Sequence, residues 1–179
     1  MKNKGFTRQN FLKKNLNGFT LIELVITCFV ISMGVIGAFT VIQRIVFYTS
    51  FSFSRSVAGY LAQEGIEIIR NIRDSNWLDP TSDWDDGINA GPSYYLDYQS
   101  QSFPDPDCSG KEYLEILSSG GKEFWQCSSN PSAKFKRKIT ITKPEADKIE
   151  VLVEVEWQEH GEAYKVSSQE NLYNWFRLE

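Results

Sequence analysis

Glu23 is the side chain with the clearest potential for chemistry, because it is the only charged residue in the apolar stretch from Gly18 to Ile42. An ionised carboxylate inside a bilayer is costly unless it is paired, so an acid at such a position indicates a function. The stretch contains no Lys, Arg or His, and a partner for Glu23 must therefore come from outside it. Two simpler interpretations are that Glu23 reaches the lipid headgroups or that it is protonated.

Catalytic chemistry has much less support. His160 is the only histidine, and it stands beside Gly161 where a hairpin turn is predicted, a poor place to hold a base rigidly. The chain has no phosphate-binding glycine loop, no GxGxxG and no CxxC pair. We therefore expect a protein that is not an enzyme, with no catalytic residues, no cofactor and no metal.

One acidic segment is a candidate calcium ligand set. The residues from Ser75 to Pro92 are rich in turn formers and predict a loop, which carries Asp83, Asp85, Asp86 and Asn89. Calcium binds several oxygen ligands, but no Glu stands where an EF-hand loop needs one. A solvated acidic turn is the alternative interpretation.

The apolar stretch predicts a membrane-spanning helix. Its 24 residues from Phe19 to Ile42 would extend roughly 36 Å as an α-helix, enough to cross a hydrocarbon core of about 30 Å. A core helix of a soluble domain seldom stays apolar on every side for this length. A cleaved secretory signal has an apolar part of only about 7–15 residues, and residues 40–47 lack the small-x-small site that such a signal needs.

Charge gives the orientation and limits the partners. Five basic residues and no acidic ones precede the apolar stretch: Lys2, Lys4, Arg8, Lys13 and Lys14. This bias keeps the N-terminus in the cytoplasm and exports the remainder. Without these five the chain has 14 basic and 23 acidic side chains, a net charge of about −9, which argues against nonspecific nucleic-acid binding.

The segment Gly18-Phe19-Thr20-Leu21-Ile22-Glu23, between a basic leader and an apolar run, resembles the processing and assembly motif of type IV pilins and type II secretion pseudopilins. The resemblance implies that a prepilin peptidase cuts after Gly18, removes residues 1–18 and methylates the new amine of Phe19. It also implies that Glu23 of one subunit neutralises the Phe19 amine of its neighbour in a filament. A positive and a negative charge that are each costly in lipid become tolerable as a pair.

The helix is predicted to continue beyond the membrane, over residues 19–74 in all. Between Gln43 and Arg73 there is no proline, and apolar residues recur at helical spacing at Val57, Leu61, Gly65, Ile68 and Ile72. A kink within 48–54, or two separate helices, is the alternative. The segment from Tyr60 to Asp74 also resembles the same region of minor pilins of the pilus modification type.

The exported part, residues 75–179, predicts a globular domain rich in strands. Alternating or β-branched segments predict strands over 93–99, 113–117, 123–127, 135–143, 149–158 and 163–172. The last three form an antiparallel meander with a turn at His160 and Gly161. A helix with such a meander is an α+β arrangement, which agrees with the pilin-like fold that the motif implies.

Cys108 and Cys127 lie in the part that is predicted to be exported, where disulfides persist. A bond between them would close a loop of about 20 residues and contribute on the order of 3 kcal/mol. Two buried thiols are the alternative.

Two classes of function remain. The first is a minor structural subunit of a type IV pilus, with a secretion pseudopilin as its close alternative. The second is a membrane-anchored exported binding domain outside any filament. The expected partners are a prepilin peptidase, other pilins and membrane lipid, and the expected location is the inner membrane, with a single pass and a cytoplasmic N-terminus.

Overall fold

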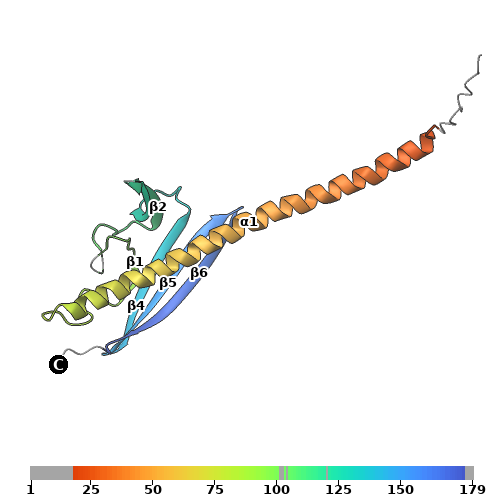
Figure 1. The fold of residues 1–179 in the computed structure, drawn as a ribbon. Coiled ribbons are helices and arrows are strands. Elements are labelled where there is room, and N and C mark those ends of the chain that lie inside the picture. Colours follow the sequence, from red (N-terminus) through yellow and green to blue (C-terminus); the bar gives the residue numbers. More distant parts are fainter. Residues whose placement is uncertain (1–17, 101–102, 104, 120, 176–179) are drawn as a thin grey trace, which may run out of the picture. The chain divides into compact units, whose positions relative to one another are not determined.

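The computed structural model describes residues 18–100, 103, 105–119 and 121–175. Over these residues the chain forms an α-helix, α1 (Leu21–Leu78), followed by strands only (Figure 1). The chain divides into two compact units, residues 1–47 and residues 48–179. The fold is α+β and pilin-like in architecture, as predicted.

The helix α1 is continuous from Leu21 to Leu78, which confirms one long helix rather than two. The serine-rich part is helical too, and its hydroxyls find acceptors inside the helix: Ser54 donates to Ser50 O at 3.1 Å. The helix ends four residues later than the predicted Asp74. It stops directly before the Asp79-Pro80 pair, because a residue that precedes proline disfavours the helical conformation.

The strands of the described residues form one antiparallel sheet in the order β3-β2-β4-β5-β6, with β1 paired to β4. Their bounds are β1 Gly91–Tyr94, β2 Tyr113–Ser119, β3 Lys122–Ser128, β4 Phe135–Glu145, β5 Lys148–Glu159 and β6 Glu162–Tyr173. The predicted meander is β4-β5-β6. Its turn has positive φ at both central residues, 54° at His160 and 85° at Gly161, as a two-residue hairpin turn requires.

The predicted strand over 93–99 is wrong beyond Tyr94. The chain leaves the sheet there, and Asp97 bends it because its carboxylate accepts a hydrogen bond from the Gln99 amide at 2.9 Å. An aspartate that bonds its own backbone competes with strand pairing. Leu96 is consequently buried, whereas Tyr98 remains exposed instead of sharing its face.

In the unit formed by residues 48–179, the second part of α1 packs on one face of the sheet (Figure 1). The core joins Ala58, Leu61 and Ile69 of the helix to Val153 and Val155 of β5, all of them buried. The apolar stripe predicted for the helix is thus the face that it buries. Summed over such side chains, burial of apolar area is the main stabilising term of the domain.

Gly65 lies where α1 packs tightly against β5. A Cβ atom on Gly65 would stand 3.0 Å from Val153 Cγ1 and 3.2 Å from Val153 Cγ2. Such contacts are tighter than most real Cβ contacts, so any larger residue at position 65 would require Val153 to shift.

Arg137 is a fully buried charged residue at this interface. It points inward from β4, as the alternation of that strand predicts, and its side chain is 1% exposed. Nη1 donates to Leu61 O at 3.0 Å and to Glu64 Oε2 at 2.8 Å, while Nη2 donates to Leu96 O at 2.7 Å. Burial lowers the pKa of Arg137, and the nearby Glu64 carboxylate opposes that change.

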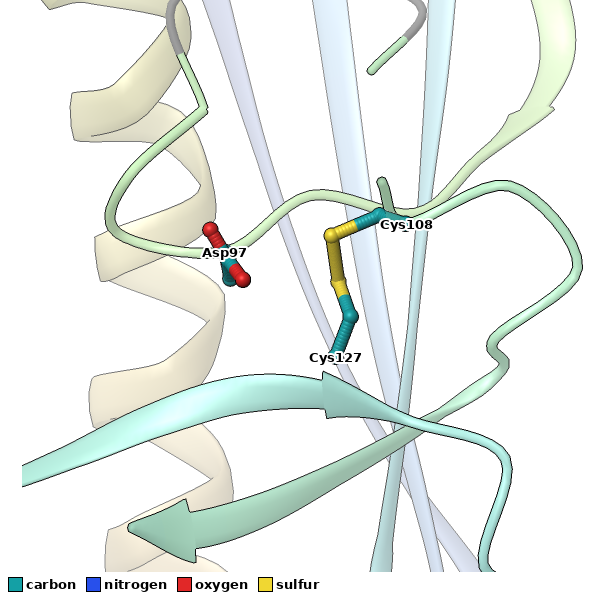
Figure 2. Close-up of side chains that lie close together, drawn as sticks. All are labelled: Asp97, Cys108 and Cys127. Carbon is teal, nitrogen blue, oxygen red and sulfur yellow. A yellow bond between two sulfur atoms is a disulfide. The ribbon is translucent and has the colours of Figure 1, made fainter. Parts of the chain in front are cut away.

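The predicted disulfide is present. Cys108 and Cys127 are bonded, with their Cα atoms 5.4 Å apart, and the bond joins the segment before β2 to β3. Figure 2 shows the Asp97 carboxylate beside this bond. Asp97 and the two sulfur atoms lie within 4.8 Å of one another, but sulfurs that are bonded to each other cannot act as thiolate ligands of a metal.

Candidate processing and assembly site

The site predicted from sequence lies at the start of α1. Gly18, Phe19 and Thr20 are not helical, and all three are exposed. Phe19 is 79% exposed, and no atom lies within 4 Å of the place where a Gly18 Cβ would stand. The peptide bond between Gly18 and Phe19 therefore lies in open, non-helical backbone, which is the form that a peptidase can bind.

Thr20 is the residue that starts the helix. Its Oγ1 accepts a hydrogen bond from the Glu23 amide at 3.3 Å, and Leu24 N donates to Thr20 O at 3.1 Å. These bonds make Thr20 an N-cap. The sequence interpretation did not include this role, although a threonine three residues before a glutamate and next to an apolar run is the signature of a capping box.

Glu23 lies in the first turn of α1 and is exposed. A carboxylate is favourable there because the N-terminus of a helix carries partial positive charge. Among the described residues no ion pair involves Glu23. Helix capping thus gives Glu23 a local role, and its predicted intermolecular partner stays a prediction.

The first part of α1 is long and apolar enough to cross a membrane. None of its apolar stretch is buried in the structure. Its hydroxyl groups are satisfied inside the helix. Thr27, Ser32 and Thr40 each donate to the carbonyl four residues earlier, at 2.7, 2.7 and 2.6 Å. Such internal bonds remove the cost of placing a hydroxyl in lipid.

The family model described as "Prokaryotic N-terminal methylation motif" matches residues 13–39. The chain is type IV pilin-like. The matched range contains the basic end of the leader, Gly18, Glu23 and most of the apolar stretch. No curated protein and no solved structure was found to match the chain.

This motif supports a type IV pilin or pseudopilin substrate of prepilin peptidase. It also fits a membrane-anchored protein with one pass, and it indicates a structural subunit rather than an enzyme. The matched residues 13–39 overlap the apolar first part of α1, which begins at Leu21.

The residues considered as calcium ligands form hydrogen bonds that hold the loop in place in this structure. Asp85 Oδ2 accepts from Lys143 Nζ at 2.5 Å, and Asp86 Oδ2 accepts from the Asp83 amide at 2.9 Å. Asn89 Nδ2 donates to Phe103 O at 3.0 Å. These contacts hold the loop to β4 and to itself. His160 lies in the β5–β6 turn, as predicted.

Proposed function

We propose that this chain is a minor structural subunit of a type IV pilus. In this proposal prepilin peptidase cuts between Gly18 and Phe19, Phe19 is N-methylated, and the mature chain enters a membrane-rooted filament. The motif match at residues 13–39, at the start of a long apolar helix, is the observation that carries the proposal. The resemblance of residues 60–74 to minor pilins favours a pilus over a secretion pseudopilus.

The mature chain would have three parts. Residues 1–18 are the leader that is removed, residues 19–42 cross the inner membrane, and residues 75–179 form most of the exported domain, with 43–74 as the helical link. The excess of basic residues in the leader supports a cytoplasmic N-terminus.

Cleavage would create the positive partner that Glu23 lacks within its own chain. The new amine of Phe19 is positive and stands at the N-terminus of a helix, where a positive charge is unfavourable. Glu23 of an adjacent subunit would neutralise that amine and fix the axial register between subunits. Two buried charges are tolerated only when they pair closely, so a mismatched register would be penalised.

The test is co-expression of the full chain with a prepilin peptidase. We expect the chain to lose its leader of 18 residues, roughly 2 kDa, and mass spectrometry to find a methylated Phe19 at the new terminus. Gly18→Val should remain uncut, whereas the matched control Gly34→Ala, inside the helix, should be cut normally. Filaments that contain the chain with Met1 still present would contradict the proposal. Recovery only with secretion machinery would favour the pseudopilin.

A further inference from the structure

A pocket at the C-terminal end of α1 combines tryptophan rings with amide and carboxylate groups. It has a volume of about 210 Å³, and its lining includes Asn76, Trp77, Asp79, Asp83, Trp84 and Asn174. These residues come from the last turn of α1, the loop that follows it and the chain just after β6 (Figure 1). None of its residues lies in the range 13–39 that the methylation motif matches.

The two amides of the pocket are oriented by the fold. Asn76 Nδ2 donates to Trp84 O at 3.3 Å and to Asp86 O at 2.8 Å, which leaves Asn76 Oδ1 as an acceptor. Asn174 Oδ1 accepts from Trp77 Nε1 at 3.4 Å, which leaves Asn174 Nδ2 as a donor. Within the described part of the chain no hydrogen bond is recorded for either remaining atom. The pocket therefore offers both a fixed acceptor and a fixed donor.

The two carboxylates differ in their availability. Asp79 accepts bonds from the Thr81 amide and hydroxyl at 3.0 and 2.7 Å and from Ser82 Oγ at 3.1 Å. The bonds from Thr81, and next that from Ser82, lower the pKa of Asp79. Asp83 is exposed, and no bond to its carboxylate is recorded in the described residues, so it can accept from a ligand.

The surroundings of the Trp77 ring disfavour a cationic ligand. The Arg73 guanidinium stands 4.3 Å from the centre of the Trp77 ring, and Trp175 packs edge-on against Trp77 with 5.0 Å between centroids. A cation thus occupies one face of Trp77, which makes a second cation there unfavourable. Trp175 is 70% exposed and extends the aromatic surface outward.

We propose that this pocket binds a neutral saccharide. A sugar ring has an apolar C–H face, which packs on tryptophan, and hydroxyls that donate and accept at once. That combination matches the rings, the donor of Asn174 and the acceptors of Asn76 and Asp83. A quaternary ammonium ligand would use the rings and carboxylates but neither amide. At about 210 Å³ the pocket is smaller than the usual site of a drug-sized ligand, so the proposed ligand is a single sugar unit.

The test uses the full chain in nanodiscs free of glycolipid, probed on an array of neutral and charged oligosaccharides. The best neutral glycan is then titrated while tryptophan fluorescence is followed. We expect binding by a neutral glycan, and a loss of affinity of about tenfold or more in both Asn174→Ala and Asp83→Ala, since each removes a hydrogen-bonding partner. The matched controls Asn171→Ala, on β6, and Asp107→Ala, outside the pocket, should bind as the parent does.

Three results would overturn the proposal. The first is an array on which no neutral glycan binds. The second is binding that survives unchanged in both pocket variants. The third is saturable quenching by tetramethylammonium without glycan binding, which would make the pocket a cation site. Asp83 is exposed, so its substitution leaves folding intact and a lost signal in that variant reports on the ligand.

Discussion

Arg137 of β4 donates a hydrogen bond to Glu64 of α1 across the helix–sheet interface, with 2.8 Å between Nη1 and Oε2. The guanidinium is buried with a 1% exposed side chain, whereas the Glu64 side chain is 30% exposed. The pair therefore places the cation in the core and leaves part of the anion in water. Removing the anion leaves a buried charge whose remaining recorded partners, among the described residues, are the Leu61 and Leu96 carbonyls and the nearby Asp97 carboxylate.

Glu64→Ala should destabilise the domain by about 2 kcal/mol. This is less than the roughly 3–5 kcal/mol for a fully buried pair, because Glu64 is 30% exposed and Arg137 keeps two carbonyl partners. Urea unfolding of the full chain in detergent measures this change. Glu67→Ala is the control, because Glu67 is 60% exposed and should cost less than about 1 kcal/mol. Equal losses in the two variants would contradict the role given to Arg137.

Gly65→Ala should destabilise the domain by about 1–3 kcal/mol, because the added methyl group would press on Val153 at 3.0 Å. Gly59 is on the same helix with nothing within 4 Å of a Cβ, so Gly59→Ala should stabilise by up to about 1 kcal/mol. The midpoints of urea unfolding compare the two variants directly. A neutral Gly65→Ala would show that helix and sheet can separate without cost.

Glu159 contributes stability that depends on pH. The pKa of Glu159 lies below its ordinary value of 4.5, and the hydrogen bond from the Ser50 hydroxyl is the largest cause. Since the folded-state pKa is depressed, this contribution is complete above pH 4.5 and is lost as pH falls through the lowered folded value. Ser50→Ala should therefore reduce stability above that range and flatten its decline in acid, in unfolding curves recorded at a series of pH values. Ser56→Ala, which bonds only within α1, should keep the parent's pH profile.

Reduction of the Cys108–Cys127 bond should cost about 3 kcal/mol, as expected for a closed loop with a sequence separation of 19. Thermal unfolding of the Cys108→Ser, Cys127→Ser double variant should match that of the reduced parent. The remaining cysteine, Cys28, is exposed and free, so Cys28→Ser should leave unfolding of the exported domain unchanged. A double variant as stable as the oxidised parent would show that the loop is ordered without its link.

Glu23→Ala should still be cut by prepilin peptidase but should enter filaments poorly, because the neighbour's new amine would lack a counter-charge in lipid. Cleavage is scored by mass and incorporation by the amount of chain in sheared filaments. Glu123→Ala, on an exposed position of β3, is the control that keeps both steps normal. Normal incorporation of Glu23→Ala would refute the pairing.

Much of the fold was predictable because it depends on periodicity. The stripe that includes Leu61 and Ile68, and the alternation through Ile139 in β4 and Val153 in β5, identify buried faces from residue spacing alone. The disulfide was predictable from its compartment and its pair of cysteines, but only the structure decides whether the sulfurs meet.

The rest depends on contacts between distant segments or on local competition. The alternation of its strand predicts that Arg137 points inward. Its partners Leu61, Glu64 and Leu96 are distant in the sequence, so the pattern does not predict them. The strand predicted through residue 99 fails because Asp97 bonds its own backbone, which an alternation pattern does not detect. The N-terminal motif was recognisable from the sequence and a family model matches it, whereas the N-cap at Thr20 required the structure.

That cap decides how the chain is presented to an endopeptidase. A scissile bond wound into an α-helix has its carbonyl and amide committed to neighbouring turns, and an enzyme would first have to unwind it. Because α1 begins only at Leu21, the Gly18–Phe19 peptide bond lies two residues before the helix. The Thr20 hydroxyl thus marks the boundary between non-helical backbone and α1. If the chain is cut after Gly18 as proposed, a substitution that extended the helix upstream would slow the cleavage without changing Gly18 itself.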